Sequence, residues 1–207
     1  DPAAATTTTL WTLNRCTTSA QYRPGTLPAW DGPKSGNQPY TGPINDLGPD
    51  GVSLPHQLVC SGLTWGGYQN GRIPMSAMRN SNAAGPMEPS AAVAYDRLAQ
   101  AGAEAGFDFK GWSYRPAADQ AGSATAGKTC HGLGLAVDIT NMDYRDGVTC
   151  GGSHLACLAT PQGQWVLQHA ADFGFILEDY ALGCRGNSGS QSNVCEPWHL
   201  AYVAYTP

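Results

Sequence analysis

The clearest periodic stretch of the chain runs from residue 89 to residue 106. Pro89 and Ser90 form a helix-start signal, and Gly106 ends the pattern. Between them, apolar residues recur at the three- and four-residue spacing of one helix face. These residues are Ala91, Ala94, Leu98, Ala101 and Ala105. The pattern predicts an amphipathic helix of about four turns.

A second helical pattern covers residues 162–173. Trp165, His169 and Phe173 repeat at four-residue spacing, and Gly174 follows them as a stop. We interpret His169 as a packing residue on the aromatic face of this helix, hydrogen-bonded to a neighbour. The pattern therefore predicts a helix and assigns no chemistry to His169.

Short strands are predicted between and after these helices, at residues 107–115, 130–139, 175–177 and 198–205. A short helix is predicted at residues 117–121, just before the small-residue loop that leads into the second strand. Helices and strands are interspersed without a regular β-α-β alternation. We therefore predict an α+β fold, in which a small antiparallel sheet has flanking helices.

Residues 1–70 have a different composition, rich in Thr, Gly, Pro and Asn, and show little periodicity. Their scattered aromatic residues could bind glycan, but aromatics in a loop-rich segment more often pack on the neighbouring domain. At 207 residues the chain is long enough for one large domain with an extension. We predict a loop-rich, disulfide-tied extension over residues 1–70 and a catalytic domain over residues 71–207.

Composition excludes several classes of partner. A net charge of -5 and only 13% charged residues provide no basic patch for nucleic acid. No apolar run reaches the roughly 20 residues that span a bilayer, so we expect no membrane span. Asp1-Pro2 is not a natural initiation sequence, and we expect the chain to begin after a removed secretion signal. We expect a secreted or extracytoplasmic monomer.

The chain has seven cysteines at irregular spacings, without the C-x-x-C pairs of a structural zinc site. Disulfides in an oxidising compartment are the better interpretation. Pairing the nearest neighbours predicts Cys150–Cys157, Cys184–Cys195 and Cys16–Cys60. The remaining cysteine, Cys130, is then predicted to be a free and buried thiol on the opposite face of a strand from its neighbour His131.

Candidate metal chemistry centres on residues 129–140, with the sequence TCHGLGLAVDIT. His131 and Asp138 are suitable ligands for zinc, and a catalytic zinc usually takes a third protein ligand. His199, in the segment Cys195-Glu196-Pro197-Trp198-His199, supplies it. Zinc hydrolysis also needs a base and a group that stabilises the oxyanion. Glu196 is the candidate base, and Arg115 is the candidate clamp for an oxyanion or a substrate carboxylate.

Three ordered segments resemble the zinc metallopeptidases that trim D-alanyl-D-alanine ends of peptidoglycan. His131, Gly134, Ala136 and Asp138 match the pattern H-x-x-G-x-A-x-D. The segment 196–199 matches E-x-W-H, and the segment 112–120 resembles an arginine- and glutamine-bearing motif. The family includes vancomycin-resistance carboxypeptidases, dipeptidases and phage endolysins. The resemblance covers roughly residues 70–207.

The resemblance implies roles for residues that match these motifs. It implies one zinc per chain on His131, Asp138 and His199, with Glu196 as base and Arg115 as clamp. The implied substrate-binding residues are Gln120, Thr129 and Trp198. Thr129 replaces the family's usual serine and narrows the pocket by one methyl group, and Trp198 is expected to pack under the ligand strand.

The implied function is that of a zinc D,D-carboxypeptidase that removes the terminal D-alanine from peptidoglycan stem peptides or their precursors. Two alternatives share the same ligands: a peptidoglycan endopeptidase and a D-Ala-D-Ala dipeptidase. A different class, the non-catalytic zinc-bearing module, occurs in hedgehog signalling domains, which resemble this fold. A cell-wall-binding module of that kind would need neither Glu196 nor Arg115.

Overall fold

The structure is a computed structural model that describes residues 47–49, 51–55, 58–120, 127–142, 157–158, 160–178 and 196–204. Its two main helices are α2 (Pro89–Glu104) and α4 (Pro161–His169). The central sheet has the strand order β3-β4-β6-β5 and is antiparallel throughout. Its strands are β3 (Gly111–Trp112), β4 (Ala136–Ile139), β5 (Phe175–Ile176) and β6 (His199–Tyr202). The predicted α+β class is confirmed.

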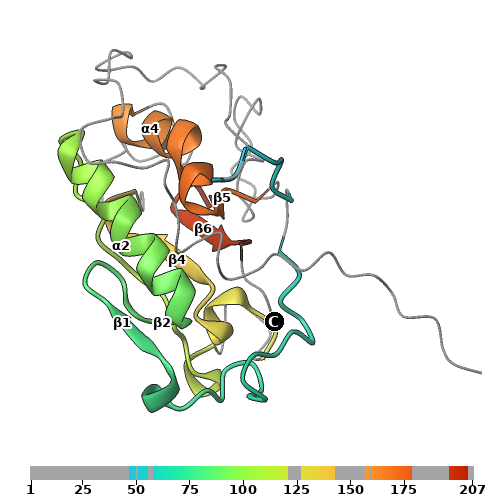
Figure 1. Ribbon diagram of the computed structural model, residues 1–207. Helices are drawn as coiled ribbons and strands as arrows, with labels where there is room; N and C mark the ends of the chain where they lie inside the picture. Colours follow the sequence, from blue (N-terminus) through green and yellow to red (C-terminus); the bar gives the residue numbers. More distant parts are fainter. Residues whose placement is uncertain are drawn as a thin grey trace, which may run out of the picture.

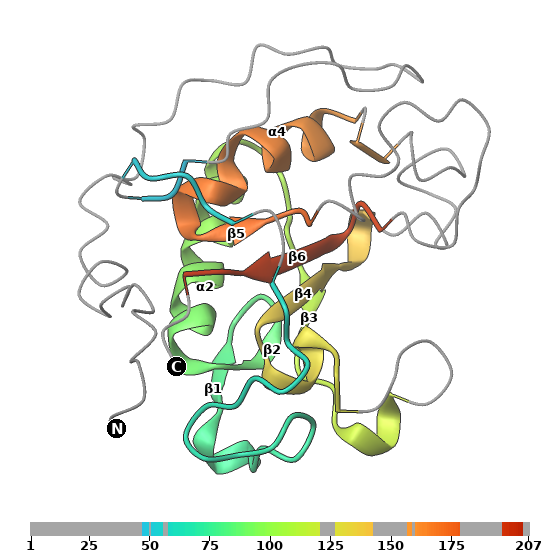
Figure 2. The same cartoon turned by 90° about the vertical axis from the view of Figure 1, so that its right-hand side faces the viewer.

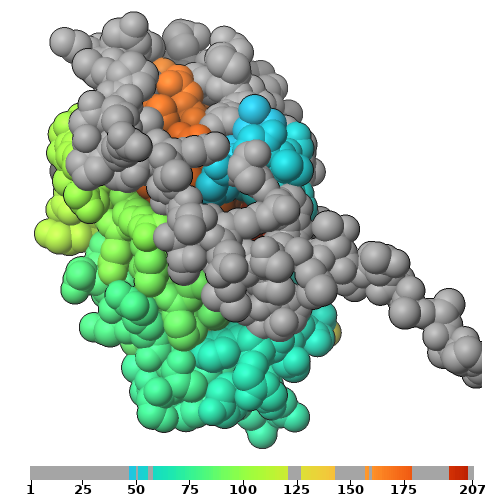
Figure 3. Space-filling model, in the orientation of Figure 1, coloured from blue at the N-terminus to red at the C-terminus, as the bar shows by residue number. Residues whose placement is uncertain are grey.

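A small hairpin and several 3-10 helices complete the described elements. Strands β1 (Arg79–Ser81) and β2 (Gly85–Met87) form the hairpin, which lies beside α2 in Figures 1 and 3. The 3-10 helices are η1 (Met75–Ala77), η2 (Ala117–Asp119), η3 (Cys130–Leu133), η4 (Thr140–Met142) and η6 (Ala170–Phe173). The short helix predicted at residues 117–121 is thus present as η2.

Local capping explains where α2 begins. The Glu88 carboxylate accepts hydrogen bonds from the backbone amides of Ser90 (2.8 Å) and Ala91 (2.9 Å), and Pro89 occupies the first turn. Gly106, at a φ of 90°, follows the end of the helix. The helix predicted from residue 89 is confirmed.

The second predicted helix is also confirmed, with a change of helix type near its end. The Thr160 hydroxyl accepts a hydrogen bond from Gly163 and caps α4. After His169 the chain tightens into η6, and Gly174 ends it at a φ of 79°. The His169 ring packs 4.8 Å from Trp165, and its Nδ1 lies 3.2 Å from the Asp172 carboxylate, as predicted for a packing histidine.

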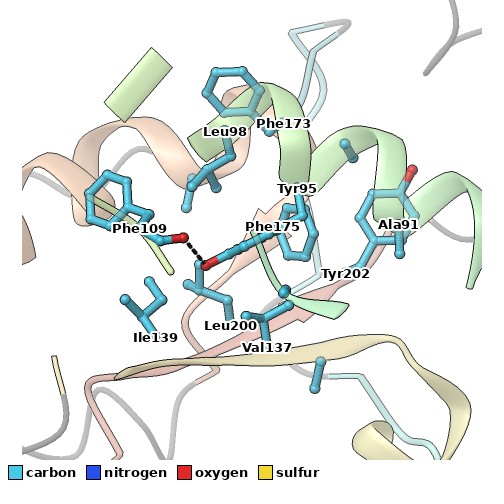
Figure 4. Close-up of a cluster of buried hydrophobic side chains, with 14 of the residues drawn as sticks. Ala91, Tyr95, Leu98, Phe109, Val137, Ile139, Phe173, Phe175, Leu200 and Tyr202 are labelled. Carbon is cyan, nitrogen blue, oxygen red and sulfur yellow. Dashed lines mark hydrogen bonds between the residues drawn. The ribbon is translucent and has the colours of Figure 1, made fainter. Parts of the chain in front are cut away.

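Helix α2 covers one face of the central sheet and builds the main core (Figure 4). Tyr95 and Leu98 of α2 lie over side chains that alternate along β4 and β6, namely Val137, Ile139, Leu200 and Tyr202. The Tyr95 hydroxyl donates to the Phe109 carbonyl at 3.0 Å. Burial raises the pKa of Tyr95, so the phenol remains a hydrogen-bond donor.

A separate apolar cluster covers the opposite face of the same sheet. It joins Leu54 to Ile176, Ala201 and Val203, with Leu58 packed against its edge. Figures 1 and 2 show residues 51–55 and 58–60 on the side of the sheet away from α2. The described part of the predicted extension therefore packs on the domain, while the boundary at residue 70 stays a prediction.

Several predicted strands are shorter than expected. The strand predicted over residues 130–139 is wrong in its first half, because Cys130–Leu133 forms η3 and only Ala136–Ile139 is extended. Thr129 accepts a hydrogen bond from the Gly132 amide, and Gly134 adopts a φ of 66°, which turns the chain between helix and strand. Strands β3, β5 and β6 are likewise confined to 2, 2 and 4 residues.

The predicted free thiol at Cys130 is wrong, and so is the predicted Cys16–Cys60 pair. Cys60 and Cys130 form a disulfide across 70 positions, with their Cα atoms 5.1 Å apart. Because the entropic cost of closing a loop grows only slowly with its length, nearness in sequence was a poor guide to pairing. Cys157 is also disulfide-bonded. The predicted partners Cys150, Cys184 and Cys195 lie outside the described residues.

None of the helices in the described ranges combines the length and apolar character required to cross a bilayer.

Candidate metal centre

Two of the predicted ligands face each other across neighbouring strands. Asp138 of β4 is paired with His199 of β6 in the sheet register. Because side chains alternate along a strand, and Val137, Ile139 and Leu200 face α2, Asp138 and His199 point to the opposite face. The Nδ1 atom of His199 lies 2.9 Å from the Oδ1 atom of Asp138.

The third ligand, His131, reaches this face from the 3-10 turn that precedes β4. Its Nε2 atom lies 3.2 Å from the same Asp138 Oδ1 atom. Its Nδ1 atom lies 2.8 Å from the Ser113 carbonyl, which can only accept a hydrogen bond. Because the Ser113 carbonyl takes the Nδ1 proton, Nε2 is the ring nitrogen of His131 that is placed to bind a metal ion.

The donor set fits a zinc ion. One ligand atom from each of His131, Asp138 and His199 can be chosen so that all three lie within 4.8 Å of one another. Tetrahedral zinc with bonds of about 2.0–2.2 Å separates its ligand atoms by about 3.3–3.6 Å, slightly more than the 3.2 Å and 2.9 Å between Asp138 Oδ1 and the two histidine nitrogens. Two imidazoles and one carboxylate leave a fourth position open, as catalytic zinc sites do. All three side chains are buried.

Contacts among the same atoms explain the pKa shifts of Asp138 and His199. Burial by itself would raise the pKa of Asp138, but the charges and hydrogen bonds of His131 and His199 outweigh burial and hold the pKa well below its usual value. Burial would lower the pKa of His199, but hydrogen bonds to Asp138 and Glu178 raise it to about 10.

A stacked aromatic group supports His131. The Trp112 ring lies 4.6 Å from the His131 ring at an interplanar angle of 20°. Trp112 also pairs with Asp138 across β3 and β4, which places its side chain on the face of the ligands. The Arg115 guanidinium lies 4.3 Å from the centre of the Trp112 ring, and the Arg115 amide donates to the His131 carbonyl at 3.0 Å. The predicted clamp is therefore fixed next to the ligand turn.

The predicted base lies in the turn that begins β6. The Glu196 carbonyl accepts a hydrogen bond from the His199 amide at 3.0 Å, which closes a four-residue turn with Pro197 at its second position. Such a turn keeps its first and last Cα atoms within about 7 Å. The backbone of Glu196 is therefore close to the third ligand, and the residue itself is half-buried.

The three predicted substrate-binding residues differ in their surroundings. Gln120 is fully buried, and its amide group donates to the Arg115 carbonyl (2.8 Å) and accepts from the Gly127 amide (2.9 Å). Trp198 is 5% exposed. Thr129 is half-buried and caps the ligand turn. Substrate contact by these three residues stays a prediction, and for Gln120 the hydrogen bonds indicate a positioning role.

Sequence reasoning missed two groups beside the ligands. Glu178, only 3% exposed, follows β5 and lies with its Oε2 atom 3.5 Å from the Nε2 atom of His199. Its signal was an acidic residue placed directly after the apolar run 175–177. Asn70 donates to the carbonyls of Cys60 (3.3 Å) and Thr129 (2.9 Å). A Cβ atom on Gly132 would lie 1.9 Å from the Asn70 side-chain oxygen, so this close approach requires glycine.

Comparison with known proteins gives one matching family model and several similar solved structures, one of which is the LdcB LD-carboxypeptidase. Residues 107–205 match the family model VanY, described as D-alanyl-D-alanine carboxypeptidase. This range contains all eight predicted site residues. No curated protein matches the chain. The solved structure of the LdcB LD-carboxypeptidase is 22% identical, with a TM-score of 0.47 over 64% of this chain and 71% of that chain.

Proposed function

We propose that this chain, which carries a domain of the VanY family over residues 107–205, is a zinc-dependent D,D-carboxypeptidase of the cell wall. The family predicted from the sequence is thereby confirmed over that range. The proposed substrate is a peptidoglycan stem peptide, or its precursor, that ends in D-Ala-D-Ala. The observation that carries the proposal is the buried convergence of His131, Asp138 and His199, with Glu196 three residues before the last ligand.

The proposed ligands are the Nε2 atom of His131, the Asp138 carboxylate and the Nδ1 atom of His199. When bound, zinc would polarise the scissile carbonyl and activate the attacking water. Hydrolysis would then proceed by direct attack of water, without a covalent intermediate on the protein. The buried setting of the three ligands strengthens every electrostatic interaction within the site.

The remaining roles fall to residues of the two flanking segments. Glu196 takes a proton from the attacking water and passes it to the leaving amine. Arg115 binds the oxyanion or the terminal carboxylate of the substrate through paired hydrogen bonds. Gln120 holds the Arg115 backbone by the 2.8 Å bond to its carbonyl, so that the guanidinium is presented at a fixed place beside the ligand turn.

The proposal also covers the setting in which the protein works. An enzyme with a peptidoglycan substrate and disulfides belongs on the extracytoplasmic side of the cell. We propose that it acts as a secreted monomer with one zinc per chain, and that residues 1–70 form an extension outside the catalytic domain.

The deciding experiment is mass spectrometry of products from a stem pentapeptide ending in D-Ala-D-Ala, incubated with the zinc-loaded protein. The expected product is the tetrapeptide and free D-alanine. Intact peptidoglycan and the free dipeptide D-Ala-D-Ala are run in parallel. Release of cross-link fragments would identify an endopeptidase, and cleavage of the dipeptide alone would identify a dipeptidase. Absence of cleavage in all three arms, with stoichiometric zinc, would leave a non-catalytic zinc module.

A further inference from the structure

We infer that Glu178 is a positioning residue of the metal centre, which fixes the His199 ring so that its Nδ1 atom faces the metal. The inference rests on the proposed function, because it assigns a role within the same site. The motif comparison that identified the ligands contains no counterpart of Glu178, which lies 21 residues before His199.

The geometry places Glu178 on the far side of the ring from Asp138. The Nδ1 atom of His199 lies 2.9 Å from the Asp138 carboxylate, and its Nε2 atom lies 3.5 Å from the Glu178 carboxylate. Each ring nitrogen of His199 therefore faces a different carboxylate. A metal that displaces the proton from Nδ1 leaves Nε2–H to point at Glu178. An imidazole can bind a metal through either ring nitrogen, and this arrangement favours binding of His199 through Nδ1 over binding through Nε2.

The position of Glu178 follows from the order of strands. Strand β5 ends at Ile176 and pairs with β6, the strand that carries His199. Ile176 is paired with Ala201, so the chain beyond Ile176 continues antiparallel to β6 toward His199. Glu178, two residues beyond Ile176, comes level with His199, two residues before Ala201. The alternation of side chains places both on the face opposite α2.

A hydrogen bond anchors the other oxygen of the Glu178 carboxylate. The Leu58 amide donates to the Oε1 atom of Glu178 at 2.7 Å, across 120 positions of sequence. Only a carboxylate accepts on both of its ends. A glutamine at this position would turn its NH₂ group toward either Leu58 N–H or His199 Nε2–H, and one donor would meet another. Position 178 therefore requires a carboxylate, because a glutamine of the same shape could not accept from both donors.

Leu58 also connects the two halves of the ligand set. It lies two residues before Cys60, whose disulfide partner Cys130 directly precedes His131. The segment 58–60 thus bonds to Glu178, behind His199, and to Cys130, beside His131. We define these three residues as the strap. Its described contacts reach η3, which carries His131, through the disulfide, and they reach His199 only through Glu178, which follows β5.

The test compares Glu178→Gln with the wild-type protein in two measurements that do not depend on turnover. The first is zinc affinity, by competition with a chromogenic chelator, where we expect about a 10- to 100-fold weaker binding, the usual effect of removing a partner behind a ligand. The second is the long-range ¹H–¹⁵N NMR spectrum of the zinc-loaded proteins. In the wild type we expect the His199 proton on Nε2 with slow solvent exchange, and in the variant a faster exchange.

The matched control is Glu88→Gln. Glu88 is also buried, at 8% exposed, and its carboxylate accepts hydrogen bonds from two backbone amides at the start of α2. The described partners of this carboxylate all belong to that helix. This variant should lose stability and keep its zinc affinity, which separates positioning from general destabilisation.

The results that overturn the inference are zinc affinity in Glu178→Gln within twofold of wild type, or a wild-type spectrum with the His199 proton on Nδ1. If Glu178→Gln does not fold, the wild-type spectrum alone decides. The pentapeptide assay is independent of both measurements. A protein that binds zinc through the Nδ1 atom of His199 but cleaves no substrate would uphold the inference and refute the proposed function.

Discussion

At the scale of single residues, one carboxylate oxygen of Asp138 contacts both histidines of the candidate site. Oδ1 of Asp138 lies 3.2 Å from Nε2 of His131 and 2.9 Å from Nδ1 of His199. Because these contacts order the three side chains within the fold, less conformational freedom is lost when a metal binds.

Substitution of Glu196 tests the proposed proton transfer separately from metal binding. We expect Glu196→Ala to retain one zinc per chain, because the three ligands stay in place, and to lose at least about 100-fold in turnover, because a positioned acid–base contributes at least that much. Zinc content by elemental analysis and kcat with the pentapeptide check the two statements. Glu104→Ala, at the exposed end of α2, serves as the control. Full activity in Glu196→Ala would refute the proposed mechanism.

The sequence identified three candidate ligands that the structure brings together, but it did not identify the residues that support them. His131, Asp138 and His199 belong to compact motifs whose residue types are tied to zinc chemistry, and the structure brings them together. Glu178 belongs to no such motif. Its position depends on the pairing of β5 with β6, which hydrophobic periodicity does not reveal.

At the scale of elements, the strap 58–60 and the turn η3 act as one unit through the Cys60–Cys130 disulfide. The sequence placed Cys130 in a strand and left it unpaired. A strand requires an extended backbone, but the Thr129 cap and the left-handed Gly134 make a 3-10 turn of the same residues. Long helices were predicted correctly because their patterns span several turns, whereas strands of two to four residues carry too few positions to define a period.

Removal of this disulfide should destabilise the protein. We expect the double variant Cys60→Ser, Cys130→Ser to lose up to about 4 kcal/mol of unfolding free energy, the chain-entropy value for a loop of 70 residues. Urea unfolding of the zinc-free proteins measures the change. Substitution is preferable to a reductant, because Cys157 is also disulfide-bonded. An unchanged unfolding midpoint would show that the strap is held by its other contacts.

At the scale of the whole molecule, the described chain has a core on each face of one small sheet. The larger core lies under α2 and gives the sheet its support, and the smaller one joins Leu54 and Val203 on the face of the metal centre. Hydrophobic periodicity predicted only the part of the larger core that α2, α4 and η6 contribute, and its other residues come from strands, turns and loops. It did not predict the smaller one, since residues 51–55 have no regular pattern.

The charges of the metal-free site predict how stability depends on pH. The pKa of His199 is raised from 6.5 to about 10, so its contribution is fully present below pH 6.5 and is lost as the pH rises toward 10. The pKa of Asp138 is lowered from 3.8, so its contribution is present above that pH and is lost in stronger acid. We expect the thermal midpoint of the zinc-free protein to be highest between these limits and to fall on the alkaline side.

With zinc bound, the thermal midpoint should no longer fall on the alkaline side, because the metal replaces the proton on His199. Thermal unfolding with and without zinc, from pH 5 to pH 10, checks the prediction, and the stabilisation by zinc should grow with pH. A zinc-free midpoint that rises steadily through pH 8 would contradict it. Acid should release the metal, because protons compete with zinc for its ligands.

The disulfide beside His131 has a further consequence for metal selectivity. Thiolates bind zinc and other soft cations strongly, and a reduced Cys130 would place such a ligand next to the imidazole. As half of a disulfide, its sulfur is withdrawn from that competition, and the ligands of this centre stay limited to nitrogen and oxygen. A preparation made under reducing conditions is therefore expected to differ from the disulfide-bonded protein in which metals it captures, even where its fold is the same.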